Sequence, residues 1–205
     1  MRLLYVLKRY AGKIEIGQPF KTLIKCIISQ RTREETTEKA AKRLFAIASS
    51  PSEIARLDVK RIEKAIKPCG FYKQKAKRIK EIARIIAKRY GGHVPKDRKT
   101  LLSLPGVGWK TSAVVLAYGH GIPIIAVDTH TARIAKRLGL AESNAGVEEV
   151  RKALEVRFKK SDWKWVNIGM VNFGRAICLP RRPKCQACPL RSICKFYNDR
   201  RTLPS

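Results

Sequence analysis

The chain has 205 residues, of which 45 are Lys or Arg and 16 are Asp or Glu, so its formal net charge at pH 7 is +29. Hydrophobic residues make up 44% of the chain, which excludes a disordered basic tail and predicts a folded core. The apolar runs are too short to span a bilayer, and the first residues show no cleavage site typical of an export signal. A folded protein with such a surplus of cations is typical of nucleic-acid binding.

The positive charge is concentrated in two segments. Residues 61–100 hold 14 basic and 3 acidic side chains, and residues 178–205 hold 7 basic and 1 acidic. We expect these segments to lie beside a nucleic-acid backbone. There they would supply salt-sensitive affinity that does not depend on base sequence.

Helical periodicity dominates the chain. Between Tyr72 and Tyr90 apolar residues recur every three or four positions and form one stripe, opposite a row of lysines and arginines. Similar patterns predict helices over residues 20–29, 34–48, 107–118, 129–138, 147–158 and 163–177. The one strand-like piece, 122–127, has no partner strand, so the predicted fold class is all-α.

Two short helices have recognisable starts. Ser50 and Glu53 flank a proline in a capping-box pattern, which predicts a helix from residue 51 to about 57. Asp58 can cap the next helix, which must end before Pro68.

Four of the six cysteines, Cys178, Cys185, Cys188 and Cys194, are separated by six, two and five residues. In a chain without an export signal, such crowding predicts a metal held by thiolates rather than disulfides. Zinc sites usually present two close pairs, whereas only Cys185 and Cys188 are close here. An iron–sulfur cubane takes one ligand at each iron and tolerates unequal loops. The spacing therefore favours such a cluster over zinc.

The run Leu104-Pro105-Gly106-Val107-Gly108 separates two helical patterns. Gly106 and Gly108 permit the positive φ values, or the close backbone approach, that a tight hairpin needs. The helix after it begins with backbone N–H groups that have no helical partner, and its dipole favours an anion. We therefore expect Gly106, Val107 and Gly108 to bind a phosphate of the nucleic-acid backbone.

Lys110 lies in the first turn of the helix after the hairpin, and Asp128 follows the apolar run 122–127. A cation is disfavoured at a helix N-terminus, which favours the neutral amine, a nucleophile that can form a Schiff base at a sugar C1′. A carboxylate at Asp128 could stabilise a cationic sugar. The simpler alternatives are a phosphate-facing surface lysine and a helix N-cap. His130 is expected to have a structural role.

Together, Leu104–Thr111, Val127–His130 and the cysteine spacing resemble the endonuclease III family of DNA glycosylases, in the helix-hairpin-helix superfamily. The likeness runs from about Phe20 to Cys194. It implies a six-helix barrel domain with the hairpin at residues 20–132. It also implies a helical iron–sulfur domain, at residues 1–19 plus 133–205, with a [4Fe–4S] cluster.

By this resemblance, Lys110 is the catalytic lysine, Asp128 is the catalytic aspartate, and the four crowded cysteines are the cluster ligands. The basic loop that family members lay on the DNA backbone corresponds to Arg181, Arg182 and Lys184. The cluster is expected to have a structural and DNA-docking role, because the chemistry needs no redox step.

The family flips its target nucleotide out of the duplex and fills the gap with side chains. Direct register places Arg31 at the gap-filling position, where endonuclease III carries a glutamine, and Gln30 stands one residue before it. Both therefore remain candidates. Phe71 is the candidate for the apolar wedge on the opposite strand, with core packing as its alternative role.

The resemblance implies a monomeric enzyme that acts in the cytoplasm, at the nucleoid of a prokaryote, on duplex DNA containing damaged bases. Its expected activity combines removal of damaged pyrimidines such as thymine glycol with cleavage of the abasic strand. One alternative is a mismatch glycosylase that removes uracil or thymine opposite guanine. The other alternative is a non-enzymatic DNA-binding module with a structural or redox-sensing cluster. Such a module would need neither Lys110 nor Asp128.

Overall fold

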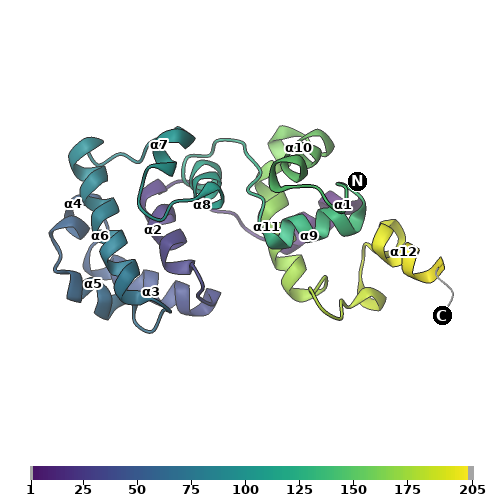
Figure 1. The fold of residues 1–205 in the computed structure, drawn as a ribbon, viewed down its shortest axis with the longest axis horizontal. Helices are drawn as coiled ribbons and strands as arrows, with labels where there is room; N and C mark the ends of the chain where they lie inside the picture. Colours follow the sequence, from purple (N-terminus) through teal and green to yellow (C-terminus); the bar gives the residue numbers. More distant parts are fainter. Residues whose placement is uncertain (1, 203–205) are drawn as a thin grey trace. The chain divides into compact units, whose positions relative to one another are not determined.

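The computed structural model describes residues 2–202, which form helices joined by turns and loops, with no β-strand in this range (Figure 1). The predicted all-α fold class is therefore confirmed. The chain divides into two compact units. We call Ile16–Ile122 the hairpin unit, and Met1–Glu15 with Pro123–Ser205 the cysteine unit. The domain borders at residues 20 and 132 stay a prediction, and residues 1 and 203–205 lie outside the described residues.

The hairpin unit is built around α6, Tyr72–Arg89. Its other helices are α2 Pro19–Ser29, α3 Glu34–Ile47, α4 Pro51–Arg56, α5 Val59–Ile66, α7 Arg98–Leu102 and α8 Trp109–Val114. α4 and α5 pack against α6, and α2 packs against α3, α6 and α8. The predicted apolar stripe of α6 has no solvent exposure: Ala76, Ile79, Ile82, Ala83 and Ile86. Burial of this stripe stabilises the helix, so its periodicity correctly identified part of the core.

The helix starts of α4 and α5 carry the predicted caps. The Ser50 hydroxyl accepts from the Glu53 backbone N–H at 3.2 Å, and the Glu53 carboxylate accepts from the Ser50 N–H at 2.9 Å. The Asp58 carboxylate accepts from the Lys60 N–H at 2.6 Å. These bonds satisfy N–H groups that have no partner inside the helix, which is why both helices begin at these residues.

The helix predicted over residues 107–118 differs from the observed one. α8 is short, and Val115–Gly119 continue it as a π-helical turn. This turn packs on α2, where a Cβ added to Gly119 would lie 2.8 Å from the Cα of Pro19. Glycine is therefore required here by a close approach of two backbones, which helical periodicity alone does not predict.

The cysteine unit contains α1 Arg2–Ala11, α9 Thr129–Leu138, α10 Val147–Arg157, α11 Trp163–Ala176 and α12 Lys195–Thr202. Figure 1 shows the N-terminal α1 among helices from the second half of the chain. It packs along α11, where a Cβ on Gly169 would lie 2.4 Å from the Leu7 carbonyl oxygen. The Tyr10 carbonyl accepts from the Asn172 side-chain amide at 3.0 Å. The first residues of the chain thus help to build the unit that carries the four cysteines.

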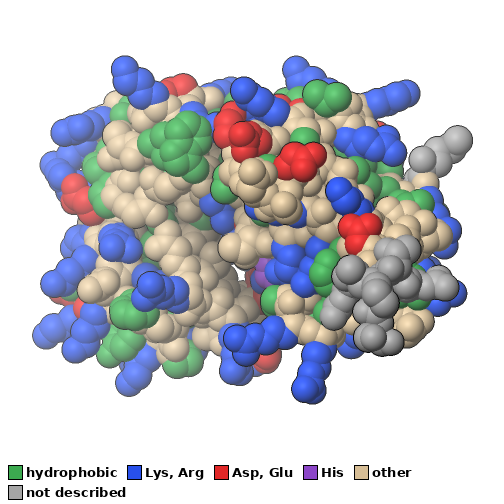
Figure 2. Space-filling model, turned by 45° about the vertical axis from the view of Figure 1, so that its right-hand side comes forward, with side chains coloured by type: hydrophobic (Ala, Val, Ile, Leu, Met, Phe, Trp, Pro, Cys, Tyr) green, Lys and Arg blue, Asp and Glu red, His purple; other side chains and the backbone are tan. Residues whose placement is uncertain are grey.

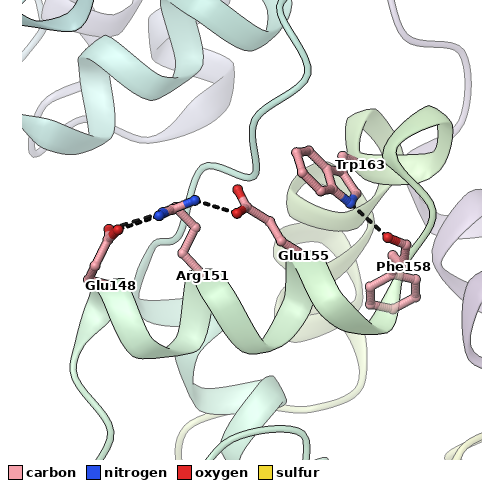
Figure 3. Close-up of polar contacts among 5 residues, drawn as sticks. All are labelled: Glu148, Arg151, Glu155, Phe158 and Trp163. Atoms are coloured by element: carbon pink, nitrogen blue, oxygen red, sulfur yellow. Dashed lines mark hydrogen bonds and ion pairs between the residues drawn. The ribbon is translucent and has the colours of Figure 1, made fainter.

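α10 supports α9 from the side. Its buried residues Val150 and Leu154 join the core of the cysteine unit, and α10 packs on α9. On the surface of α10, Arg151 lies between Glu148 and Glu155 and forms ion pairs with both (Figure 3). Such pairs neutralise acidic residues locally and add little stability. The surplus of positive charge therefore remains with the other basic side chains.

The strand-like segment forms no strand. Ile125 and Val127 are 1% and 7% exposed and belong to the core of the cysteine unit, so the segment's hydrophobicity reflects burial of a connection without regular secondary structure. Among the described residues, no helix is long and apolar enough to cross a membrane.

Candidate active site and metal centre

The hairpin joins α7 to α8 in the hairpin unit. Gly106 has φ +75°, and the Val107 N–H donates to the Leu104 carbonyl at 3.1 Å, which closes the turn. The Val107 side chain is 6% exposed and anchors the hairpin, so any contact it makes with a ligand is through its backbone. Gly108 has φ −100°, so of the two hairpin glycines only Gly106 has a positive φ. A Cβ on Gly108 would meet no atom within 4 Å, so this glycine leaves room for close approach from solvent.

Lys110 lies in the first turn of α8 with an exposed side chain. Burial raises the pKa of the Cys26 thiol to about 11, and the nearby ammonium groups of Lys110 and Lys25 oppose this rise. Lys110 is thus close to α2. Trp109, which the sequence analysis did not single out, is 62% exposed, and the Arg98 guanidinium lies 4.9 Å from its ring centre. The hairpin unit therefore presents an amine and an aromatic ring to solvent at one helix start.

The turn between α2 and α3 brings the gap-filling candidates together. The Gln30 side-chain amide donates to the Gly106 carbonyl at 2.9 Å, which ties the turn to the hairpin. Arg31 is exposed, has φ +52°, and places its guanidinium carbon 5.6 Å from the Phe71 ring centre. Phe71 is 57% exposed and has φ +57°. The alternative that Phe71 packs in the core is therefore wrong.

Asp128 precedes α9 in the cysteine unit. Its carboxylate accepts from the Thr131 N–H at 2.8 Å, and the Thr131 hydroxyl accepts from the Asn167 side-chain amide at 3.1 Å. The N-cap role of Asp128 is therefore confirmed. A capping carboxylate can also act on a bound ligand, so its catalytic role stays a prediction. His130 Nδ1 lies 3.1 Å from an Arg133 guanidinium nitrogen, which agrees with a structural role.

The four crowded cysteines line one small cavity of the cysteine unit together with apolar side chains. Burial raises the pKa of Cys188, a hydrogen bond from the Leu190 N–H opposes this rise, and the proximity of Cys194, Cys178 and Cys185 adds to it. Yet in the described part of the chain no three His, Cys, Asp or Glu side chains converge enough to hold one metal ion. Zinc would need every sulfur at about 2.3 Å from one point. A cluster takes one thiolate at each of several irons, which fits this arrangement better.

Two arginines of α9 hold the start of the cysteine loop, residues 178–194. The Arg133 guanidinium donates to the Cys178 carbonyl at 2.9 Å. The Arg137 guanidinium donates to the Leu179 carbonyl at 2.7 Å and to the Pro180 carbonyl at 2.9 Å. Sequence analysis missed both arginines. Their spacing of four residues on a helix that also carries buried Ile134 and Ala135 was the available signal.

The basic side chains predicted to meet DNA are accessible. Arg181, Arg182 and Lys184 are all exposed on the cysteine loop, and Arg182 has φ +49°. On the face drawn in Figure 2, Lys and Arg side chains are spread over the surface and Asp and Glu are few. This surface suits a polyanion.

A cavity of about 590 Å³ opens at the N-terminal end of α2, lined by residues that include Lys21, His93, Lys96 and His120. None of the predicted site residues lines it. It lies at the end of α2 opposite to Gln30, so it is separate from the hairpin.

Comparison with known proteins extends these observations. Residues 24–160 match the HhH-GPD superfamily of base excision DNA repair proteins. Residues 178–194 match the iron-sulfur binding domain of endonuclease III, and they begin and end with the outer two crowded cysteines. The endonuclease III of Thermotoga maritima is 44% identical over 95% of this chain and 91% of its own length.

Two solved structures are similar over nearly the whole chain. One is a trapped endonuclease III–DNA covalent intermediate in an estranged-adenine complex. It is 34% identical, with a TM-score of 0.83 over 96% of each chain. The other is a thermostable thymine-DNA glycosylase, 28% identical, with a TM-score of 0.85 over 97% of this chain and 94% of that one. The similarity therefore includes residues of both units.

Proposed function

The chain belongs to the endonuclease III family of base excision DNA repair glycosylases with AP lyase activity, and we propose that it removes oxidised or otherwise damaged pyrimidines, such as thymine glycol, from duplex DNA. We further propose that it acts as a monomer, in the cytoplasm and at the nucleoid. The observation that carries the proposal is an exposed lysine, Lys110, in the first turn of the helix after the hairpin.

Lys110 is the proposed nucleophile. Its neutral amine attacks C1′ of the damaged nucleotide, the glycosidic bond breaks, and the base leaves with the bonding electrons. The sugar ring opens to an imine between the lysine nitrogen and C1′. Loss of a proton from C2′ then expels the 3′ phosphate by β-elimination, and water releases the enzyme from the product. The first turn of α8 places this lysine directly after the hairpin that would bind a DNA phosphate.

Asp128 is the proposed electrostatic partner. Its carboxylate would stabilise positive charge on the sugar as the base departs. Its hydrogen bond to the Thr131 N–H fixes the side chain before substrate arrives. A preorganised carboxylate loses little entropy during the reaction, so the cap supports the proposed chemistry.

The hairpin backbone, from Gly106 through Gly108, would bind a DNA phosphate, and Arg31 and Phe71 would occupy the space left by the flipped nucleotide. Gln30 is engaged by the Gly106 carbonyl, which favours Arg31 as the gap-filling side chain. Because Gln30 joins the turn to the hairpin, its own contribution to DNA binding is to hold the two together.

The four residues Cys178, Cys185, Cys188 and Cys194 would hold the [4Fe–4S] cluster. When bound, the cluster supplies irons that neutralise the thiolates and tie together distant points of the cysteine loop. The loop itself presents Arg181, Arg182 and Lys184 to the DNA backbone. We propose a structural and docking role for the cluster, because no step assigned to Lys110 or Asp128 transfers electrons.

A mismatch glycosylase acting on uracil or thymine opposite guanine is the second candidate. The similarity to a thymine-DNA glycosylase supports it. A lysine that can form an imine favours combined excision and strand cleavage over base excision alone.

Borohydride trapping tests the proposal. The imine formed on a lesion-bearing duplex is reduced to a stable covalent complex that migrates as one species. We expect the wild-type protein to be trapped on duplexes containing thymine glycol, dihydrouracil or an abasic site. Lys110→Ala should abolish trapping, whereas Lys42→Ala, which removes an exposed lysine of α3 outside the two basic segments, should be trapped like the wild type.

The same assay separates the candidates. Excision restricted to uracil and thymine opposite guanine would favour the mismatch glycosylase. Binding without excision or trapping on any substrate would favour the non-enzymatic module. Unchanged trapping by Lys110→Ala would contradict the lysine assignment.

A further inference from the structure

Lys75 of α6 is buried although lysine is rarely buried without a partner. Lys75 is 2% exposed, and among the described residues it is the one buried Lys or Arg. Burial lowers the pKa of Lys75, an effect that nearby Cys69 opposes. A buried amine of this kind persists only where hydrogen bonds compensate for lost water.

The side-chain hydrogen bonds of Lys75 reach both ends of the turn between α2 and α3. Lys75 Nζ donates to the Ile28 carbonyl and to the Thr32 hydroxyl, both at 2.7 Å. Ile28 lies in the last turn of α2, where carbonyl groups have no helical partner and a cation is favoured. The Thr32 hydroxyl in turn donates to the Gln30 carbonyl at 3.3 Å. The amine therefore holds the turn that carries Arg31 from both of its ends.

Lys75 is also hydrogen-bonded to the second gap-filling candidate, Phe71. The Lys75 backbone N–H donates to the Phe71 carbonyl at 3.0 Å, in the first turn of α6. A Cβ on Gly70 would lie 3.4 Å from the Arg31 carbonyl oxygen, so the two turns are in close contact. Lys75 thus links the segment of Arg31 to that of Phe71.

Both candidate side chains stand on strained backbone. Arg31 and Phe71 have φ values of +52° and +57°, which are uncommon for residues other than glycine. Such conformations persist where surrounding contacts determine them. The two hydrogen bonds of the Lys75 ammonium supply these contacts at the Arg31 turn.

We propose that Lys75 is a positioning residue that fixes the Arg31 turn against Phe71, so that both side chains enter the duplex together when a nucleotide is flipped out. This rests on the proposed function. Lys75 itself touches no DNA. It acts by holding two side chains in the geometry that fills the gap, so less order has to be gained on binding.

The test compares one abasic strand in two forms. In the duplex form, a 2-aminopurine opposite the abasic site reports unstacking by fluorescence. In the single-stranded form, no gap has to be filled. Single-turnover strand cleavage is measured on both, with the full cluster-loaded chain. Lys75→Met keeps the side-chain length and removes the ammonium, and Lys75→Arg retains the cation.

We expect Lys75→Met to slow duplex cleavage about tenfold or more, as expected for loss of buried hydrogen bonds to a charged group. Single-strand cleavage should stay within about twofold, and the duplex fluorescence change should fall in parallel. Lys75→Arg should recover part of the duplex cleavage rate and part of the duplex fluorescence change. Lys42→Met, at an exposed lysine of α3 outside the basic segment 61–100, removes equal charge and should leave the duplex-to-single-strand ratio unchanged.

Thr32→Val is a milder second variant that removes one of the two acceptors, and it should lower the duplex-to-single-strand ratio in the same direction. Hydrogen exchange of the free protein needs no activity. Lys75→Met should speed exchange at Gln30–Thr32 and leave α6 beyond Ala76 protected. An equal loss of cleavage rate on both DNA forms would overturn the positioning role. Unchanged hydrogen exchange at Gln30–Thr32 in Lys75→Met would overturn it as well. Wild-type protein that cleaves neither form would instead refute the proposed function.

Discussion

The two units present their non-helical functional segments in different ways. In the hairpin unit, the Arg31 turn and the hairpin are short and held by helix ends, by Lys75 and by the bond from Gln30 to the Gly106 carbonyl. In the cysteine unit, the regular structure of the cysteine loop is limited to two short 3₁₀ helices, Cys185–Ala187 and Arg191–Ile193. Its start is held by Arg133 and Arg137, and its last cysteine, Cys194, is 9% exposed.

The turns of the hairpin unit and the cysteine loop therefore depend on different sources of stability. Turns between packed helices inherit their position from buried apolar surface, which needs no ligand. A loop held at separated cysteines depends on whatever joins the sulfurs. We therefore expect the hairpin unit to keep its structure without metal, and the cysteine loop to lose its structure.

The largest expected effect follows from removing a cluster ligand. Cys188→Ser should abolish the visible absorbance of the cluster and destabilise the cysteine unit by several kcal/mol, because ligand binding there is coupled to folding. Limited proteolysis should then cut within residues 178–194 while fragments from the hairpin unit survive.

Cys26→Ser is the matched control, because Cys26 lies in α2 of the hairpin unit and lines no part of the four-cysteine cavity. It should keep full iron content. Equal proteolysis of both units in Cys188→Ser would contradict the expected difference between them.

The next effect separates charge from capping at Asp128. Asn caps helices about as well as Asp, whereas Ala does not. Asp128→Asn should slow single-turnover excision about 100-fold, in the range for loss of an electrostatic catalytic group, with little change in thermal unfolding. Asp128→Ala should show the same loss of rate and about 1 kcal/mol less stability.

The Asp58 cap in the hairpin unit provides the comparison. Asp58→Ala should lower stability by a similar amount, about 1 kcal/mol, and leave the excision rate unchanged. Normal excision by Asp128→Asn would show that the aspartate in the cysteine unit is a cap alone.

The smallest expected effect distinguishes the two hairpin glycines. Gly106→Ala places a Cβ at φ +75°, 3.1 Å from the Arg78 side chain, and should destabilise the protein by about 1 kcal/mol. Gly108→Ala has room for its Cβ and should leave the unfolding temperature unchanged. It should weaken binding to undamaged duplex, measured by fluorescence anisotropy, because the methyl group stands where a phosphate would approach. Unaltered affinity would place the phosphate elsewhere.

Much of the secondary structure was predictable because its causes are local. The α6 stripe follows from helical spacing, and the Ser50 and Asp58 caps act within three residues of themselves. The π-turn at Val115–Gly119 was not predictable, because it depends on the packing of Gly119 against Pro19.

The candidate site likewise contains residues that the sequence could identify and residues that depend on tertiary contacts. The sequence singled out Lys110, Asp128 and the four cysteines as candidates, because chemistry restricts which residue types perform such tasks, and the family resemblance supplied their expected roles. It did not choose between Gln30 and Arg31. The structure favours Arg31, because the Gln30 amide is bound to a carbonyl 76 residues further along the chain.

The sequence by itself determined the all-α class and the surplus of positive charge, and it supplied the candidates for nucleophile and metal ligands, since composition and local spacing carry that information. Only the tertiary structure decided that Lys75 is buried at the Arg31 turn, that Arg133 and Arg137 hold the cysteine loop, and that Phe71 is exposed. Hydrogen bonds across dozens of residues leave no local pattern. In a chain with 45 basic side chains, burial and partners reveal which of them hold structure together.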